Sequence, residues 1–299
     1  MMKYKKSAGE HIFDVVNILF FALFTLICIF PIYYLFINTI SSNDLVLAGQ
    51  VNLFPRGIHF RNYISLLQTR DILQATIVTA GRTVLGTTLM VFASAFVAYI
   101  LTQQKLFARK FIYRFIIITM YFNAGLIPWF LNMSMLGLTA NFWGYILPAI
   151  VQPFNIILTK TYIESIPREL EESAFIDGAG HFATYLRIIM PISKPILATI
   201  AVFGAVAHWN SFIDSVVLML AEPKLFTLQH LLYNYLQKAT NIGKLASEQG
   251  LTGADVTSLL QGRVVSLTIA MVTMIPIVCV YPFMQRYFQK GIMLGAVKG

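Results

Sequence analysis

The chain has 299 residues, of which 57% are hydrophobic and 12% are charged, and its mean hydropathy is +0.70. This composition excludes an ordinary water-soluble globular protein and indicates an integral membrane protein. The net charge of +9 requires no nucleic-acid partner, because basic residues accumulate in the loops on the inner side of a membrane.

Six apolar runs of about 20 residues predict six membrane-spanning helices. The runs cover residues 15–37, 72–101, 115–133, 142–163, 195–221 and 264–283. The first run contains no charged residue, which argues against a water-soluble helical bundle. It is also too long for a removable signal peptide, so we expect an uncleaved signal anchor. The second and fifth runs are longer than a span requires, so we expect tilting or extension into water.

The basic residues predict that both ends of the chain are cytoplasmic. The residues then assigned to the inner side are Lys3, Lys5, Lys6, Lys105, Arg109, Lys110, Arg114, Lys160, Arg168, Arg187, Lys194, Arg286, Lys290 and Lys298. Those assigned to the outer side are Arg56, Arg61, Arg70, Lys224, Lys238, Lys244 and Arg263. The inner side therefore carries about twice as many basic residues as the outer side. Arg82 is left within the second span.

Two outer loops are long enough to contact an external partner. The first, residues 38–71, contains the turn signal Pro55-Arg56-Gly57. The second, residues 222–263, is polar, contains several glycines and includes a helix-forming stretch at 228–238. Loops of this length can also be simple lids, so both roles remain possible.

The inner loop at residues 164–194 predicts two short helices joined by a sharp turn. Pro167 suits the first turn of a helix, and Gly178 and Gly180 are expected to end that helix. Residues 182–189 are expected to form the second helix, which Pro191 stops. Such a loop between apolar spans indicates that a soluble protein docks on it.

The same loop carries a spaced motif. It reads Glu172-Ser173-Ala174, three residues, Gly178, nine residues, Ile188, one residue and Met190-Pro191. This pattern resembles E-A-A-x-x-x-G-x9-I-x-L-P, the cytoplasmic signature of permease subunits of ATP-binding-cassette (ABC) importers. It departs from that signature at Ser173 and Met190, and both departures are small.

The resemblance covers nearly the whole chain and extends to the carbohydrate-specific branch. It is carried by Pro148-Ala149, Ser165-Ile166-Pro167, His208-Trp209-Asn210-Ser211, Tyr281-Pro282-Phe283, Lys290-Gly291-Ile292-Met293 and Gly295-Ala296-Val297-Lys298-Gly299. The ending is similar to polysaccharide or oligosaccharide permeases of Gram-positive bacteria, which resemble the second permease of the maltose transporter. The resemblance implies the all-α fold of a type I ABC importer permease, with residues 1–299 as one transmembrane domain and 164–194 as its ATPase-coupling loop.

The resemblance also implies partners and a location. The partners are a second, related permease, two copies of a cytoplasmic ATPase that binds ATP and Mg, and a lipid-anchored extracellular sugar-binding protein. The implied location is the plasma membrane of a bacterium. This chain itself lacks a phosphate-binding loop, since Gly243-Lys244 is followed by Leu245 and has no upstream glycine. We therefore expect no cofactor on this chain, and nothing in the sequence indicates a metal site or a catalytic centre.

The coupling loop is expected to transmit the motion of the ATPase. Leu170, Ala174 and Phe175 would enter a groove of the ATPase, as a helix binds in a cleft. Glu171 or Glu172 would pair with basic residues at the rim of that groove. The predicted coupling residues are Leu170, Glu171, Glu172, Ser173, Ala174, Phe175, Asp177 and Gly178. The alternative is an ordinary solvated charged loop.

The fifth span is the expected substrate route. His208, Trp209, Asn210 and Asp214 lie within two turns in its middle and outer part, where ionisable groups usually face another helix or a watery cavity. Hydrogen-bonding side chains and the face of the tryptophan ring suit a sugar. The alternative is that His208 and Asn210 bond between helices and that Trp209 packs.

Arg82 is the other charged residue inside a predicted span. It can line the cavity and attract an acidic sugar, or it can pair with Asp214. Both residues fall in the outer half of the predicted topology, and we expect the pair. Asn123 is a further candidate for the pathway.

These observations predict a permease subunit that moves oligosaccharides inward by alternating access. A second hypothesis is a secondary transporter driven by an ion gradient, which would favour inverted repeats and buried acids. No repeat is visible, and Asp214 is the only acid deep in a predicted span. A third is a membrane scaffold for a cytosolic enzyme, against which the polar residues of the fifth span argue.

Overall fold

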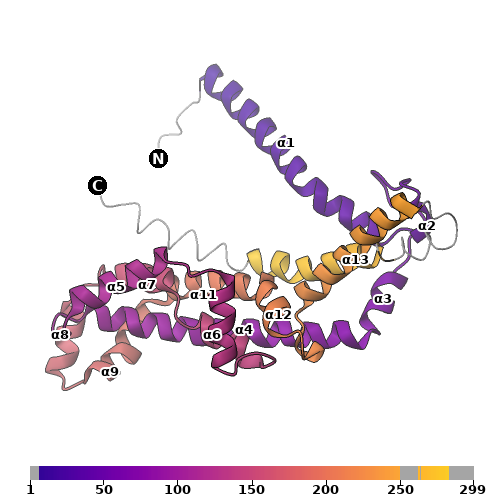
Figure 1. Cartoon of the computed structure of the whole chain (residues 1–299). Helices are drawn as coiled ribbons and strands as arrows, with labels where there is room; N and C mark the ends of the chain where they lie inside the picture. Colours follow the sequence, from indigo (N-terminus) through magenta and orange to yellow (C-terminus); the bar gives the residue numbers. More distant parts are fainter. Residues whose placement is uncertain (1–6, 250–261, 263, 283–299) are drawn as a thin grey trace. The chain divides into compact units, whose positions relative to one another are not determined.

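A computed structural model describes residues 7–249, 262 and 264–282 (Figure 1). The regular structure of these residues is helical, which confirms the predicted all-α fold. The chain forms two compact units, of which the first comprises Met1–Gln68 with Tyr235–Val272 and the second Thr69–Asn234 with Thr273–Gly299. The single permease domain of residues 1–299 remains a prediction. Lys3, Lys5, Lys6, Gly250, Gly253, Arg263 and the ending at 283–299 lie outside the described residues.

The first unit contains the first predicted span and the first outer loop. Helix α1 (Ala8–Thr39) begins at Ser7, whose hydroxyl accepts the Glu10 N–H while the Glu10 carboxylate accepts the Ser7 N–H. A 31-residue stretch of α1 is long and apolar enough to cross a membrane. The loop beyond it contains α2 (Asn43–Leu47) and α3 (Arg61–Leu67). The Asn62 amide ties this loop to the end of α1 by donating to the carbonyl of Thr39 and to Asn43 Oδ1.

The second unit is built around α4 (Arg70–Thr102), with α7 (Pro153–Ile163) and α11 (Lys194–Asn210) packed against it (Figure 1). The 33 residues of α4 extend for about 50 Å, which exceeds the thickness of the hydrocarbon layer. Two glycines allow α4 and α11 to approach closely. A Cβ at Gly86 would lie 2.5 Å from the His208 ring, and a Cβ at Gly204 would collide with the Met90 methyl group.

The third predicted span, residues 115–133, is wrong as a continuous helix. Helices α5 (Arg109–Tyr121) and α6 (Leu126–Met135) meet at 118°. Gly125 adopts φ +89°, a conformation that residues with a side chain rarely adopt. The side chain of Asn123 accepts the N–H of Gly125 at 2.8 Å and so stabilises the break.

The fourth and fifth predicted spans are interrupted as well. Residues 142–163 form two 3₁₀ turns, η1 (Phe142–Tyr145) and η2 (Leu147–Ala149), which are bent by 44° from α7. Pro148 and Pro153 explain this, because proline lacks an N–H for the helical ladder. The predicted fifth span, 195–221, is shorter than expected, because α11 ends at Asn210 and a separate α12 (Ile213–Leu218) follows.

The described residues therefore contain three helices long and apolar enough to cross a membrane, or up to six if each bent pair is one span. The three continuous helices are Gly9–Thr39, Arg70–Thr102 and Val264–Pro282. The predicted count of six spans agrees with this upper figure. The second outer loop contains η4 (Pro223–Leu225) and α13 (Leu228–Gln249), which is longer than the helix expected at 228–238.

The inner loop forms the two expected helical arms, but the second arm is longer than predicted. Helix α8 (Glu169–Ile176) is followed by α9 (His181–Thr184), a π-helical turn η3 (Tyr185–Ile189) and α10 (Met190–Ile192). Pro191 does not stop this arm, because it lies in the first turn of α10, where a missing N–H is tolerated, and the Met190 and Ser193 N–H groups on either side of it donate to the carbonyls of Tyr185 and Ile189. An 81° bend at Ser193 then leads into α11.

Candidate coupling surface and transport site

The end of α8 is shaped by a glycine in the left-handed conformation. Gly178 has φ +81°, its N–H donates to the carbonyl of Phe175, and the next N–H, of Ala179, donates to the carbonyl of Ala174. These two bonds form a Schellman motif, which satisfies carbonyls that a helix end leaves unpaired. The glycine of the motif therefore sets the direction in which the chain leaves α8.

The predicted docking residues differ in how far their side chains are exposed. Ala174 is only 7% exposed, so the expectation that it enters a partner's groove is not matched by its position. Phe175 packs edge-on against the His181 ring at 4.8 Å. Leu170 is exposed at 41%, and Ile176 is exposed at 85%. Ile176 was not among the predicted coupling residues, although it follows Phe175 directly and continues the apolar stretch of α8.

The polar residues of α8 divide into two groups. Glu172, Ser173 and Asp177 are exposed, and the Ser173 hydroxyl donates to the carbonyl of Leu170 at 3.2 Å. Glu171, by contrast, accepts a hydrogen bond from Gln103 Nε2 at 3.1 Å. Glu171 thus binds within this chain, and Glu172 presents its carboxylate outward.

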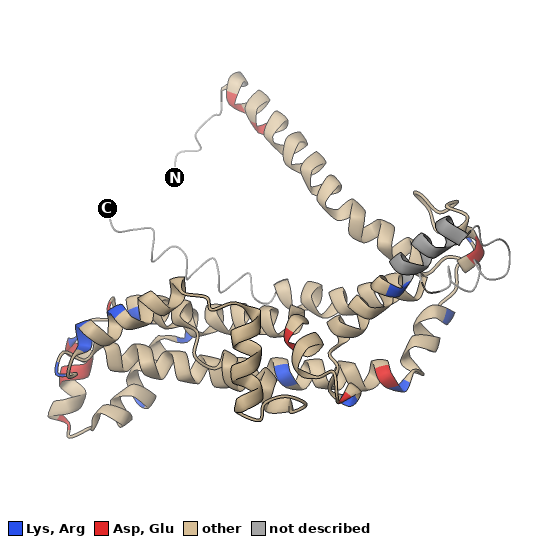
Figure 2. Ribbon diagram, viewed as in Figure 1, with Lys and Arg blue, Asp and Glu red and all other residues tan. Residues whose placement is uncertain are grey.

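The basic connector between α4 and α5 braces the start of the coupling loop. Glu164 pairs with Arg109 Nη2 at 2.9 Å and with Lys160 Nζ at 2.7 Å. Arg109 Nε also donates to the carbonyl of Leu101 at 2.6 Å. Figure 2 shows Lys, Arg, Asp and Glu residues gathered where α5 and α8 lie, whereas most of the length of α4 lacks them. The coupling loop is therefore attached to the ends of α4 and α7 by charged contacts.

A buried ion pair joins α4 to α12. Arg82 is 1% exposed, and its Nη2 lies 2.6 Å from Asp214 Oδ2. Arg82 Nη1 contacts Asp214 Oδ1 at 3.3 Å, and the guanidinium carbon lies 4.4 Å from the centre of the Tyr145 ring. The Ser211 hydroxyl and the Ser215 N–H also donate to Asp214 Oδ1. The predicted pairing of Arg82 with Asp214 is confirmed.

A second polar cluster, formed by Tyr145, Ser215 and His230, adjoins this ion pair through Ser215. The hydroxyl of Ser215 lies 2.9 Å from Tyr145 Oη and 2.9 Å from His230 Nδ1, and it accepts the N–H of Thr227 at 3.2 Å. Tyr145 Oη also donates to the carbonyl of Leu225 at 2.6 Å. The cluster therefore fastens the start of α13 to α12 and η1.

His230 is the titratable group of this cluster that belongs to the outer loop. Burial lowers the pKa of His230 below its ordinary value, and the negative charge of Asp214 opposes this shift. The imidazole is therefore held neutral against Ser215 and the Phe226 ring, whose centre lies 4.0 Å away. This cluster was not predictable from the sequence, because a single Ser, Tyr or His in or beside an apolar run carries no distinctive pattern.

Arg82 and Asp214 border a cavity of about 330 Å³ in the second unit. His208 also lines it, together with Gln152 and Asn155 at the start of α7. These two amides were not among the predicted pathway residues, although they lie on either side of Pro153 in an apolar run. The aromatic residues of the lining are Tyr145, Phe154 and Phe203. The cavity thus combines ring faces with hydrogen-bonding side chains.

The other predicted pathway residues do not line this cavity. The Trp209 indole donates to the carbonyl of Thr273 at 2.9 Å, and Asn210 Oδ1 accepts from Gln229 Nε2 at 3.2 Å. His208, Trp209 and Asn210 also lie at the end of α11 rather than in the middle of a longer span. Asn123 lines a second cavity of about 870 Å³ with Trp129, Asn132 and Asp214. Asp214 is therefore common to both cavities.

No group of His, Cys, Asp or Glu able to hold a metal ion occurs among the described residues.

Residues 90–294 match the protein family described as the inner membrane component of binding-protein-dependent transport systems. The chain belongs to this family. Its members are the permease components of ABC importers, so the permease is a membrane-embedded transport subunit.

Similar proteins agree with this assignment over almost the full chain. The permease is 33% identical over 296 residues to protein LplC of Bacillus subtilis (strain 168), covering 99% of this chain and 98% of that protein. It is 32% identical over 290 residues to the polygalacturonan/rhamnogalacturonan transport system permease protein YtcP of the same organism, covering 97% and 99%.

A solved structure supports the fold. The permease matches a chain in the crystal structure of a bacterial ABC transporter involved in the import of the acidic polysaccharide alginate. The TM-score is 0.81 at 32% identity, with 96% of this chain and 100% of that chain covered. The predicted family and permease fold are confirmed, and the scaffold and secondary-transporter hypotheses are set aside.

Proposed function

We propose that this permease forms part of the translocation pathway of an ABC importer for acidic oligosaccharides. A second, related permease completes the pathway, two copies of a cytoplasmic ATPase bind ATP and Mg, and a lipid-anchored extracellular protein delivers the sugar. Both ends of the permease are cytoplasmic. The match to the permease family supports the assignment to an importer, and the basic residues of the inner loops support the orientation.

The proposal that the sugar is acidic rests on the buried Arg82 in the cavity wall. Its guanidinium is paired with Asp214, whose carboxylate remains partly accessible and borders both cavities. A sugar carboxylate can take the place of the Asp214 carboxylate on Arg82, because guanidinium groups bind carboxylates through two parallel hydrogen bonds. The relatives named for polygalacturonan and alginate handle acidic polymers, which agrees with such an exchange.

The coupling loop supplies the movement. When the ATPases close on ATP, they displace α8, and the contacts of Glu171 and Glu164 carry this displacement to the ends of α4 and α7. Because α11 packs closely on α4 through Gly86 and Gly204, the helices that border the Arg82 cavity move with the loop. The cavity then opens outward to receive sugar, and hydrolysis returns it to the inward-facing state.

The test compares uptake of two labelled sugars of equal length, an oligogalacturonate and a neutral oligosaccharide, by the complete importer. The variant Arg82→Gln/Asp214→Asn removes both charges together, which avoids leaving either charge buried alone. We expect oligogalacturonate uptake to fall by about tenfold or more, since a hydrogen bond to a charged group contributes about 1.5–3 kcal/mol. Assembly of the complex and affinity of the binding protein should not change.

Full oligogalacturonate uptake by the double variant would contradict the role of Arg82 in the pathway. If the wild-type importer took up only the neutral sugar, the acidic class would be wrong, whereas the assignment to an ABC importer would stand. The control Trp209→Phe removes a hydrogen bond outside the cavity and should leave the ratio of acidic to neutral uptake unchanged.

A further inference from the structure

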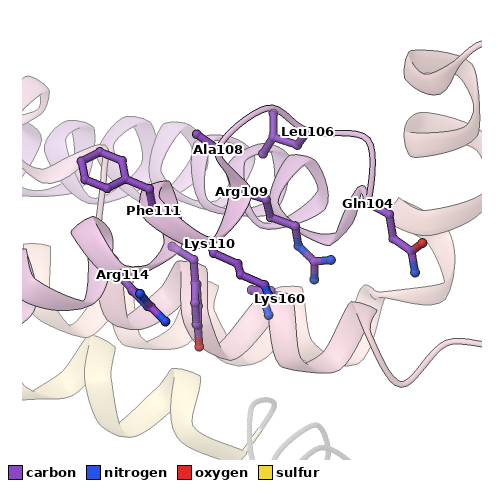
Figure 3. Close-up of a pocket in the computed structure, with 9 residues that line it drawn as sticks. Gln104, Leu106, Ala108, Arg109, Lys110, Phe111, Arg114 and Lys160 are labelled. Atoms are coloured by element: carbon purple, nitrogen blue, oxygen red, sulfur yellow. The ribbon is translucent and has the colours of Figure 1, made fainter.

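A basic cavity of about 820 Å³ lies where α5 begins (Figure 3). Four cationic side chains line it, those of Arg109, Lys110, Arg114 and Lys160. Figure 3 shows the side chains of Arg109, Lys110 and Arg114 extending to one side of α5, whereas the ring of Phe111, which also lines the cavity, points away from them. The cavity is separate from the one that borders Arg82.

The positive charge of this cavity is only partly neutralised within the chain. Glu164 pairs with both Arg109 and Lys160, and Lys160 also lies 4.4 Å from the centre of the Tyr113 ring. Among the described residues, no ion pair joins Lys110 or Arg114 to a carboxylate. The first turn of α5 has no acidic residue, although this end of a helix favours anions. The cavity therefore suits an anionic ligand.

The same helix presents an apolar strip beside the cavity. No residue of α5 is buried, and Phe111, Phe115 and Ile118 follow one another at helical spacing, with exposed fractions of 71%, 58% and 63%. Lys110 and Arg114 share one face of α5, and each directly precedes one of these apolar residues, so the apolar strip lies about 100° around the helix from the basic one. A free anion would use only the basic stripe, whereas a lipid would use both.

We propose that this basic cavity binds the headgroup of an anionic phospholipid, with an acyl chain lying along the apolar strip of α5. Lys110 and Arg114 contact the phosphodiester and the acidic headgroup, while Arg109 and Lys160 remain with Glu164. Basic pockets between helices at the cytoplasmic surface bind such headgroups through their charge. Because Glu164 begins the coupling loop, the bound lipid lies next to the segment that transmits ATPase movement.

The experiment uses the purified complete complex in detergent, with equal amounts of phosphatidylglycerol and phosphatidylcholine added, and native mass spectrometry to count bound lipids. The wild-type complex should retain phosphatidylglycerol preferentially. The variant Lys110→Gln/Arg114→Gln should lower this preference about thirtyfold, since each basic residue near an anionic lipid contributes a factor of about five. Lys110→Arg/Arg114→Lys should retain it.

The matched control is Arg187→Gln/Lys194→Gln, which removes two exposed charges on the same predicted side and should leave lipid retention unchanged. Equal retention by the wild type and Lys110→Gln/Arg114→Gln would overturn the proposal. If inorganic phosphate alone stabilised the wild type against heat but not that variant, with lipid retention unaffected, the site would bind a free anion instead. Loss of the ATPase subunit from the variant, with lipid retention unaffected, would assign the cavity to an acidic protein surface.

Discussion

The residue that most constrains this permease is Arg82, because a buried guanidinium requires a partner. Breaking a buried ion pair costs about 3–5 kcal/mol, since the remaining charge is left without compensation. Asp214 provides this partner from α12, and its carboxylate also accepts hydrogen bonds from the Ser211 hydroxyl and the Ser215 N–H.

The pairing of Arg82 with Asp214 could be predicted because both charges stand out in apolar surroundings. The Tyr145, Ser215 and His230 cluster could not, because its members approach one another only after the breaks between α11, α12 and α13.

The same cluster predicts a pH dependence for the outer loop. Because the folded state lowers the pKa of His230, the unfolded loop binds more protons below the ordinary pKa of about 6.5. The stability of the loop should therefore be complete above that pKa and decrease as the pH falls through it. The protection of the amides of residues 222–234 against hydrogen exchange, corrected for the pH dependence of intrinsic exchange, should be weaker at about pH 5.5 than at about pH 7.5.

His230→Gln should make the protection of that loop against exchange less dependent on pH, because the titrating group is gone. His59→Gln, which changes a histidine of the other unit, is the matched control and should leave the dependence intact. An unchanged pH dependence in His230→Gln would show that a group other than His230 is responsible for the effect.

At the scale of elements, the interruptions of the helices decide where the site lies. Hydropathy predicted the apolar runs well, because burial in lipid sets their length and composition. It could not show that the third and fourth runs bend, since Gly125, Pro148 and Pro153 are also compatible with a kinked continuous helix. The break after Asn210 is what turns Asp214 toward Arg82. The turn of the coupling loop was predictable, because a glycine after an acidic helix is a strong end signal.

The geometry of the turn after α8 predicts that Gly178 and Gly180 differ in how well they tolerate substitution by alanine. Gly178 has φ +81°, whereas Gly180 has φ −76°, and a Cβ at either position would meet no atom within 4 Å. Gly178→Ala should therefore cost about 1–2 kcal/mol through backbone strain alone and reduce uptake. Gly180→Ala, the matched control, should transport normally. The measurement is the uptake rate per amount of permease in the membrane.

A negative charge at the same turn should abolish coupling. Gly178→Asp should insert into the membrane in normal amounts and yet lose transport, because it places an unpaired charge where the loop contacts the ATPase. Normal uptake by Gly178→Asp would rule out the assignment of residues 164–194 as the coupling loop.

The exposed apolar side chain of Ile176 predicts a contact with the ATPase. Ile176→Asp should weaken retention of the ATPase during purification, because the aspartate would be buried without a partner in the ATPase groove. Met135→Asp is the matched control, since Met135 is similarly exposed at 87% but lies at the end of α6. Equal retention of the ATPase in both variants would place the ATPase contact elsewhere on the loop.

At the scale of the whole molecule, the second unit contains both the coupling loop and the Arg82 cavity. The family match begins within α4 and covers most of that unit. The family was predictable from the spaced motif, because a partner's surface constrains both the residue types and their spacing. The side chains that line the cavity were not predictable, because the breaks between η2 and α7 and between α11 and α12 place them.

The most direct test of the central claim is gentle affinity purification of the tagged permease from its native membranes, followed by mass spectrometry of the proteins retained. The account predicts recovery of an ATPase, a second permease and a sugar-binding protein. Recovery of the chain alone, or of a homo-oligomer without any nucleotide-binding partner, would contradict the claim that residues 164–194 couple this permease to a separate motor.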